Sequence, residues 1–423
     1  MKERLSVKRC MLAFAVALAM AVSQPVLAQT APAPFELTFW TPFTGGDGQF
    51  FDDMVAVFNA SQGSIVMKTD TVRFMSYYPK LSEALAAGTA PDVVVVHQDR
   101  LINYVGAGYF LALEPWLARA GIDRRSFAAG PLSACTFKGL TYAIPMDVHP
   151  LVMYYNKKLF AEAGITKIPS TPEELFVAAR AIQDKTGAIG LASDNTAATY
   201  KAYTLTRVFM SLLMEEGRTV LDASNTRANF NNPEGRKAYQ FLLDMVYKYG
   251  VTPKGLDYDF SVNYFKSGKA GIHFNGVWVM GVFESQPDLD FGVVPFPAFL
   301  GPNAAWAGSH AFAIPARKGM DERKVLAIMT FIDWMTTHGA LWAKAGHIPT
   351  RTSVYSTPEF RSLPHRPDYA DAVKYAFPTP ATSKWSACYA EMSDFLAEAI
   401  ALGKDARTAM TQLEARVNAI LKE

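Results

Sequence analysis

Cysteine is scarce in this chain, and so is any imbalance of charge. Its 423 residues include three cysteines, too few for a fold held together mainly by disulfide bonds. Lysine and arginine number 41 and aspartate and glutamate 39, which leaves a formal net charge of +2. A chain so close to neutral lacks the basic surface that binds nucleic acid or an anionic membrane. The 50% hydrophobic content is typical of a well-buried globular protein, and the length predicts two domains.

Long apolar runs are absent after the N-terminal segment. The longest later run, residues 270–283, includes His273 and Asn275 and falls short of the roughly 20 apolar residues that a membrane-spanning helix needs. The N-terminal segment itself has basic residues within 2–9, an apolar run at 11–22 and small or aliphatic residues at 26–28. This layout predicts a secretory signal peptide over residues 1–28.

Removal of that segment changes the charge balance. It takes away four basic residues and one acidic residue, so 37 basic and 38 acidic residues remain. Cys10 precedes the apolar run, which is the wrong side for a lipidated cysteine, so we expect no lipoprotein anchor. Cys135 and Cys388 stay in the mature chain, where export permits a disulfide bond and two separate buried thiols are an equal alternative.

Signatures of catalysis and of metal binding are also missing. The chain has no G-x-S-x-G, H-E-x-x-H, P-loop, C-x-x-C or G-x-G-x-x-G motif, and its seven histidines are scattered without metal-ligand spacing. We therefore expect no catalysis, no cofactor and no metal. Two carboxylates far apart in sequence could still serve a glycosidase, so a secreted carbohydrate-active enzyme is the alternative from another class.

Strand and helix patterns alternate along the chain, which predicts an α/β fold that starts with a parallel sheet. The helix at 75–87 should end at Gly88, and Thr171 and Asn232 should cap the helices that start with Pro172 and Pro233. The predicted strands are 35–41, 64–70, 92–96, 151–156, 188–192, 271–274, 291–294 and 312–315. The predicted helices are 49–60, 75–87, 172–184, 200–214, 233–249, 261–266, 321–336 and 404–421.

Aromatic and polar residues gather where the predicted strands end. Ligands of open α/β sheets bind beyond the carboxyl ends of strands. A neutral sugar offers apolar faces to indoles and hydroxyls to planar polar groups. The loop at 41–53 could instead hold a phosphate, but it has three aspartates and no lysine or arginine. Asp47 in that loop is expected either to cap the next helix or to accept a hydrogen bond from a hydroxyl.

Several segments, in order, resemble a known family. They are FWTPFTGGDGQFFDDMVAVFN, YYPKLSEALAAGTAPDVVVVHQDRL, GLTYAIPMDVHPLVMYYNKKLFAEAG, STPEELFVAARAI, SGKAGIHFNGVW, SHAFAIPARKG and FIDWMTTHGALWAKAGHIPTR. The chain resembles the extracellular solute-binding proteins of ABC importers, in the sugar-binding group that includes maltose-binding protein. The resemblance covers most of residues 35–351 and weakens after 352.

The resemblance implies an α/β, two-lobed periplasmic-binding-protein fold with a ligand cleft between the lobes. Both lobes would be discontinuous and joined by short hinge crossings. Lobe one would comprise residues 29–143 and 308–349, and lobe two residues 144–307 and 350–423.

The implied ligand-binding residues come from the strand ends and the crossings. Val96 stands where the family has an aromatic residue, so Trp40, Phe43 or Trp306 would supply the missing stacking face. Arg351 is expected either in the cleft or as a hinge-stabilising arginine. The full predicted set is Phe43, Thr44, Asp47, Asp99, Arg100, Asp147, His149, Asn275, Trp278, Trp306, Ser309, His310, Arg351 and Trp385.

The implied function is that of a monomeric periplasmic receptor without catalytic activity. It would capture a sugar in the cleft and present it to the membrane permease of an ABC transporter. Within the binding class, a receptor for a polyol or a glycerol-phosphate-type solute is the alternative.

Overall fold

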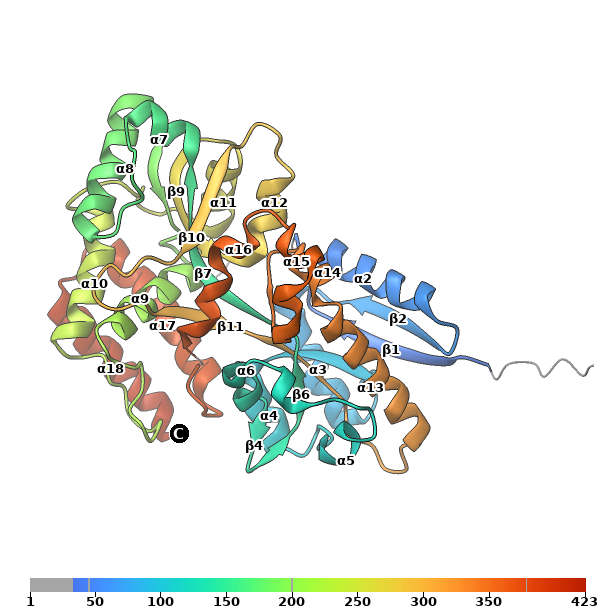
Figure 1. The fold of residues 1–423 in the computed structure, drawn as a ribbon. Coiled ribbons are helices and arrows are strands. Elements are labelled where there is room, and N and C mark those ends of the chain that lie inside the picture. The colour runs from blue at the N-terminus through green and yellow to red at the C-terminus, as the bar shows by residue number, and fades with distance from the viewer. Residues whose placement is uncertain (1–32, 45, 199–200, 378) are drawn as a thin grey trace, which may run out of the picture. The chain divides into compact units, whose positions relative to one another are not determined.

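The computed structural model describes residues 33–44, 46–198, 201–377 and 379–423 (Figure 1). The predicted signal peptide lies outside these described residues. The body of the fold, Phe35–Glu423, contains two main β-sheets and the helices packed on them. No helix in the described part of the chain has both the length and the apolar character needed to cross a membrane.

The first sheet has five strands in the order β2-β1-β3-β12-β6. β1 runs parallel to β2 and to β3, as the alternation of strands and helices predicts. β12 pairs antiparallel with both β3 and β6, so the sheet is mixed. The strands are β1 (Phe35–Thr41), β2 (Ile65–Thr71), β3 (Val93–His97), β6 (Ala143–Pro145) and β12 (His310–Ala313).

The second sheet is built around the ten-residue strand β7. Its main path is β14-β11-β7-β9-β8, and β10 and β13 also pair antiparallel with β7. The strands are β7 (Asp147–Asn156), β8 (Ile189–Ala192), β9 (Ala270–Gly276), β10 (Phe291–Pro295), β11 (Ala305–Gly308), β13 (Ile348–Pro349) and β14 (Ala376–Phe377). A separate two-stranded ribbon pairs β4 (Thr136–Phe137) with β5 (Leu140–Thr141).

Helices cover both sheets, and the predicted helix ends are confirmed. Thr171 and Asn232 each accept a backbone N–H at the start of their helices, and Gly88 ends its helix in the left-handed conformation. The helices are α2 (Gly48–Ser61), α3 (Phe74–Ala87), α4 (Gln98–Gly106), α5 (Glu114–Leu117), α6 (Ala129–Ala134), α7 (Lys157–Ala163), α8 (Pro172–Thr186), α9 (Tyr203–Glu215), α10 (Pro233–Val246), α11 (Tyr258–Lys266), α12 (Met280–Glu284), α13 (Glu322–Thr337), α14 (Gly339–Ala343), α15 (Pro358–Arg361), α16 (Arg366–Tyr369), α17 (Trp385–Ala401) and α18 (Ala406–Lys422).

Segments far apart in the sequence pack together in both parts of the core. The C-terminal helices α17 and α18 lie beside α9 and α10 (Figure 1), and their apolar side chains share one cluster with β7 and β9. The helix α13 packs on α2 and β1, and its apolar face joins the core of the first sheet. The late strand and helix, β12 and α13, therefore belong with the N-terminal sheet.

The chain passes directly from a strand of one sheet to a strand of the other at two places, and it returns to the second sheet once more through the longer segment between β12 and β13. β6 in the first sheet is followed almost directly by β7 in the second, and β11 in the second sheet is followed by β12 in the first. These two crossings run together, because Gly308 of β11 pairs with His149 of β7. Ends of strands from both sheets are thus brought to one place.

Candidate functional site

A cavity of about 400 Å³ lies at the crossings. That volume falls in the range typical of small-molecule sites. Its lining combines strand ends, loops and helices that are widely separated in sequence. The polar and aromatic lining residues are Phe43, Thr44, Asp47, Phe74, Tyr78, His97, Gln98, Asp99, Arg100, Ser133, Cys135, Thr136, Phe137, His149, Lys201, Tyr203, Arg207, Tyr258, Trp278, Trp306, Ser309, His310, His347, Thr379, Trp385 and Tyr389.

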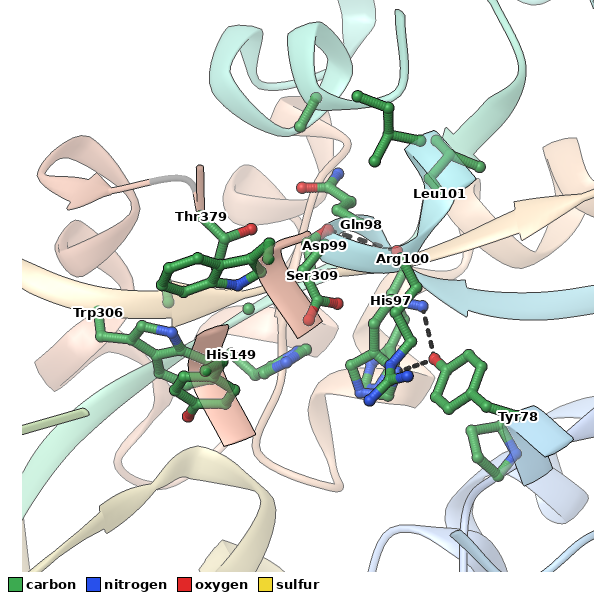
Figure 2. A pocket seen from close by; sticks show the side chains of 18 of the residues that line it. Tyr78, His97, Gln98, Asp99, Arg100, Leu101, His149, Trp306, Ser309 and Thr379 are labelled. Carbon is green, nitrogen blue, oxygen red and sulfur yellow. Dashed lines mark hydrogen bonds between the residues drawn. The ribbon is translucent and has the colours of Figure 1, made fainter. Parts of the chain in front are cut away.

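Strand pairing brings three histidines together on one side of this cavity. His310, the first residue of β12, pairs directly with His97, the last residue of β3. His149 of β7 joins them through the β7–β11 pairing. The ring centroids of His97 and His310 are 4.4 Å apart, and those of His149 and His310 are also 4.4 Å apart. Figure 2 shows His149 lying between Trp306 and His97.

The buried carboxylate of Asp147 holds two of these rings in place. Its Oδ1 lies 3.0 Å from Nδ1 of His149, and its Oδ2 lies 2.7 Å from Nδ1 of His310. The backbone N–H of His310 and the indole N–H of Trp342 also donate to the carboxylate, at 3.0 and 2.7 Å. An ionised carboxylate only accepts hydrogen bonds, so both Nδ1 atoms carry hydrogen and both Nε2 atoms keep a free lone pair when the rings are neutral.

The electrostatics of the cluster follow from burial. Burial lowers the pKa of His149 to about 4 and that of His347 to about 3, because a charged imidazole loses its hydration there. Burial by itself would raise the pKa of Asp147, but the charges of the neighbouring histidines and their hydrogen bonds outweigh it and hold that pKa well below its usual value. Asp147 is therefore ionised, and the rings of His149 and His347 beside it are neutral at neutral pH.

Aromatic side chains form the wall of the cavity next to the second sheet. The Trp278 and Trp306 rings meet nearly edge to face, with centroids 6.3 Å apart. The guanidinium carbon of Arg207, from α9, lies 4.7 Å from the Trp278 ring and 4.2 Å from the Trp306 ring. Such distances give cation–π attraction, so Arg207 braces both indoles. The indole N–H of Trp278 donates to the hydroxyl of Tyr258 at 2.8 Å.

Two indole N–H groups of this wall are buried without a partner. Neither Trp306 Nε1 nor Trp385 Nε1 makes a hydrogen bond to any described residue. Trp385 is fully buried, and Trp306 is only 5% exposed. An unpaired buried donor costs free energy, so these two donors are suited to oxygen atoms of a bound molecule.

The opposite wall comes from β3 and α4. The hydroxyl of Tyr78 contacts both Nδ1 and the backbone N–H of His97, as the dashed lines in Figure 2 show. The guanidinium of Arg100 lies 4.2 Å from the Tyr78 ring centroid. Burial raises the pKa of Asp99, and the positive charges of Arg100 and Arg207 oppose that rise. This wall of the cavity therefore combines aromatic faces with charged groups.

All but three of the residues predicted for the site line this cavity. Phe43, Thr44 and Asp47 come from the loop after β1. Phe43 packs against His310 and Trp342. The expectation that Asp47 caps α2 is wrong, because its side chain makes no capping hydrogen bond. Its Oδ2 lies instead 3.8 Å from Nε2 of His347.

Asp147, Asn275 and Arg351 do not line the cavity. Asp147 lies beneath the histidines. Asn275 is fully buried, and its side chain contacts His273 and accepts the N–H of Gly276. Arg351 turns toward α13 and pairs with Asp333, so its expected place in the cleft is wrong.

Several lining residues were missed because they come from helices. Tyr203, Arg207 and Tyr389 lie on α9 and α17, where their spacing is that of ordinary helical faces. His97 and Gln98 follow the predicted strand 92–96, and their position at a strand end was the available signal. Both cysteines in the described part of the chain are buried and free, Cys135 against the cavity and Cys388 in the helical core, so they form no disulfide.

Comparison with known proteins places the chain in a family. The family described as "Bacterial extracellular solute-binding protein" matches residues 44–341. A maltotriose-binding protein of Pyrococcus abyssi is 24% identical over 73% of this chain, and the match spans 65% of that relative, just under two thirds of its length.

Solved structures show the same fold at low sequence identity. The GacH receptor of Streptomyces glaucescens, studied with acarbose, is 22% identical, with a TM-score of 0.80 over 92% of this chain and 99% of the other. UgpB of Mycobacterium tuberculosis, solved with glycerophosphocholine, is 20% identical, with a TM-score of 0.79 over 93% and 99%. The family match extends over most of the described residues and includes most of the cavity lining and the two direct crossings between the sheets. The chain belongs to the bacterial extracellular solute-binding protein family.

Proposed function

We propose that this chain is a periplasmic receptor that captures a neutral sugar in the cavity and delivers it to the permease of an ABC transporter. It acts as a monomer and catalyses no reaction. The observation that carries the proposal is the pair of buried, unpaired indole donors on Trp306 and Trp385, set in a wall of aromatic faces. A sugar ring supplies apolar C–H faces to stack on that wall and hydroxyl oxygens to accept both donors.

The two lobes of the proposal are the segments 29–143 with 308–349 and 144–307 with 350–423. The cavity is lined by the end of β3 from one sheet and by β7 and β11 from the other, so a ligand there would contact both. A ligand that binds both lobes favours whichever lobe arrangement it fits better. The relatives named for maltotriose and for arabinooligosaccharides support a sugar as that ligand.

A glycerol-phosphate-type solute is the second candidate, and one observation favours it. Nε of Arg207 has no hydrogen-bond partner among the described residues, and a phosphate would provide one. The other two cations in the lining are engaged, since Lys201 pairs with Asp394 and Arg100 lies over Tyr78. Asp47 and Asp99 add negative charge to the same cavity, which favours an uncharged ligand.

Replacing Trp278 by alanine tests the aromatic wall. The variant should bind sugar about ten- to a hundredfold more weakly, because it loses a stacking face worth roughly 1–3 kcal/mol. Binding is measured by the change of tryptophan fluorescence on titration with neutral mono- and oligosaccharides, since three tryptophans line the cavity.

Two further variants control that experiment. Trp278→Phe keeps an aromatic face and loses only the hydrogen bond to Tyr258, so its affinity should fall less than that of Trp278→Ala. Trp334→Ala removes an indole that stacks on His338 away from the cavity and should leave the affinity unchanged. Equal affinities for wild type and a folded Trp278→Ala protein would assign Trp278 to packing alone.

A further inference from the structure

Three histidine ring nitrogens converge beside the sugar cavity. One nitrogen each from His97, His149 and His310 lies within 4.8 Å of the other two. The distance between any two nitrogens on one zinc ion is about 3.3 Å, given Zn–N bonds of about 2.0–2.1 Å and tetrahedral angles. Modest rotations of the side chains therefore suffice to bring all three onto one ion.

The hydrogen bonds of these three rings use only one nitrogen of each, so the other nitrogen of each ring is available to bind a metal ion. Asp147 binds Nδ1 of His149 and Nδ1 of His310, so their Nε2 lone pairs remain available. Nδ1 of His97 contacts the Tyr78 hydroxyl, whose oxygen can accept a hydrogen from that nitrogen. In zinc sites, the histidine nitrogen that does not bind the metal is usually hydrogen-bonded to a group such as a carboxylate. This hydrogen bond fixes the orientation of the ring and raises its basicity.

We propose that His97, His149 and His310 form a binding site for one divalent transition-metal ion, for which Zn²⁺ is the probe. Imidazole nitrogens suit zinc, copper and nickel, and three such ligands leave coordination positions free. All three histidines line the cavity, so those free positions are open to it. Asp147 is the positioning residue of this site.

A competing set of ligands, Asp147 with His310 and His347, fits less well. The Asp147 carboxylate already accepts four hydrogen bonds, from His149, from Trp342 and two from His310, which fill its lone-pair positions. His347 instead supports a metal ion held by His97, His149 and His310. It is 1% exposed, its ring centroid lies 5.5 Å from that of His310, and neither of its nitrogens makes a hydrogen bond to a described residue. Water bound to the metal would offer it one.

Two of the three rings, those of His97 and His149, also meet the requirement that histidine ligands be neutral. Burial lowers the pKa of His97 well below its ordinary value and that of His149 to about 4, so both rings are uncharged at neutral pH. The nearby thiol is a poor competitor, because burial raises the pKa of Cys135 to about 12 and a thiol binds zinc only after losing its proton.

Calorimetric titration of ZnCl₂ into the untagged, chelator-treated full chain tests the site, with no sugar present. We expect one ion bound per chain and reversal by EDTA. His149→Gln and His310→Gln should each weaken binding at least about tenfold. His97→Gln should do the same, and because His97 is only partly buried this variant is the one best placed to fold normally.

Two controls give the experiment its specificity. His338→Gln removes an exposed histidine away from the cluster, and Cys135→Ser removes the cavity thiol; neither should change the zinc affinity. The visible spectrum of Co²⁺ bound in place of zinc should show a site of low coordination number in the wild type and lose that spectrum in His97→Gln. Absence of saturable zinc binding, or binding that His97→Gln leaves unchanged, overturns the proposal. Sugar binding is measured separately, so either proposal can fail alone.

Discussion

Replacing Asp147 by asparagine is expected to lower the free energy of unfolding by about 3–5 kcal/mol, the range for a buried charge network that loses one member. Two donors point at each carboxylate oxygen, the His149 ring and the His310 backbone at Oδ1, and the His310 ring and Trp342 at Oδ2. Whichever way the amide is turned, its NH₂ faces two donors, so buried N–H groups lose their acceptor.

Urea unfolding followed by circular dichroism measures this loss. The matched control is Asp70→Asn, which breaks an exposed ion pair with Lys80 and should change stability by less than about 1 kcal/mol. An Asp147→Asn protein as stable as Asp70→Asn would mean that the histidines find other acceptors and that the carboxylate does not organise the cluster.

Replacing Arg207 by alanine is expected to weaken sugar binding by about a hundredfold or more. The guanidinium packs on the rings of Trp278 and Trp306, so its loss frees two stacking faces at once. It also removes a positive charge that opposes the burial-driven rise in the pKa of Asp99. Arginine and tryptophan anchors in buried pockets commonly contribute 2 kcal/mol or more, and about 2.7 kcal/mol corresponds to a hundredfold.

Arg119→Ala is the matched control for this variant. Arg119 also lies over an indole, 4.8 Å from the Trp116 ring, but away from the cavity, so its loss should leave sugar affinity unchanged. Arg207→Lys keeps the charge without the planar group and should bind with intermediate affinity. If Arg207→Ala and Arg119→Ala bind sugar equally well, Arg207 is not needed to hold the indoles of Trp278 and Trp306 in place.

Local patterns in the sequence were enough to predict most of the longer strands and the helix ends at Gly88, Thr171 and Asn232, but they did not predict α4, α7 or α17. The β-branched run before His97 and the proline after Asn232 act over a few residues, so no distant contact is needed to recognise them. The position of β12 between β3 and β6 depends on pairing with residues more than 160 positions away in the sequence, which no local pattern encodes. Only the family resemblance pointed to the return of that strand to the first sheet.

In the site, too, residues at strand ends could be predicted from the sequence, whereas residues on helices could not. Trp278 and Trp306 follow or form strand ends, where aromatic residues are conspicuous. Arg207 sits within a helix, and nothing in its spacing marks it as facing a cavity. The three clustered histidines are at positions 97, 149 and 310, so their spacing gave no sign of a shared site. Arg351 follows a crossing, so the sequence left both a cleft position and a hinge-stabilising role open; Asp333 and Thr336 on α13 draw its side chain away from the cavity.

The central claim is that the cavity binds a neutral sugar, and calorimetric titration of the full, metal-free chain tests it most directly. Maltotriose and other neutral oligosaccharides are titrated in parallel with glycerol 3-phosphate. We predict saturable binding of at least one neutral sugar with one molecule per chain, about a hundredfold or more weaker in Arg207→Ala, and weaker or no binding of glycerol 3-phosphate. Saturable binding of glycerol 3-phosphate with no heat from any neutral sugar would contradict the account.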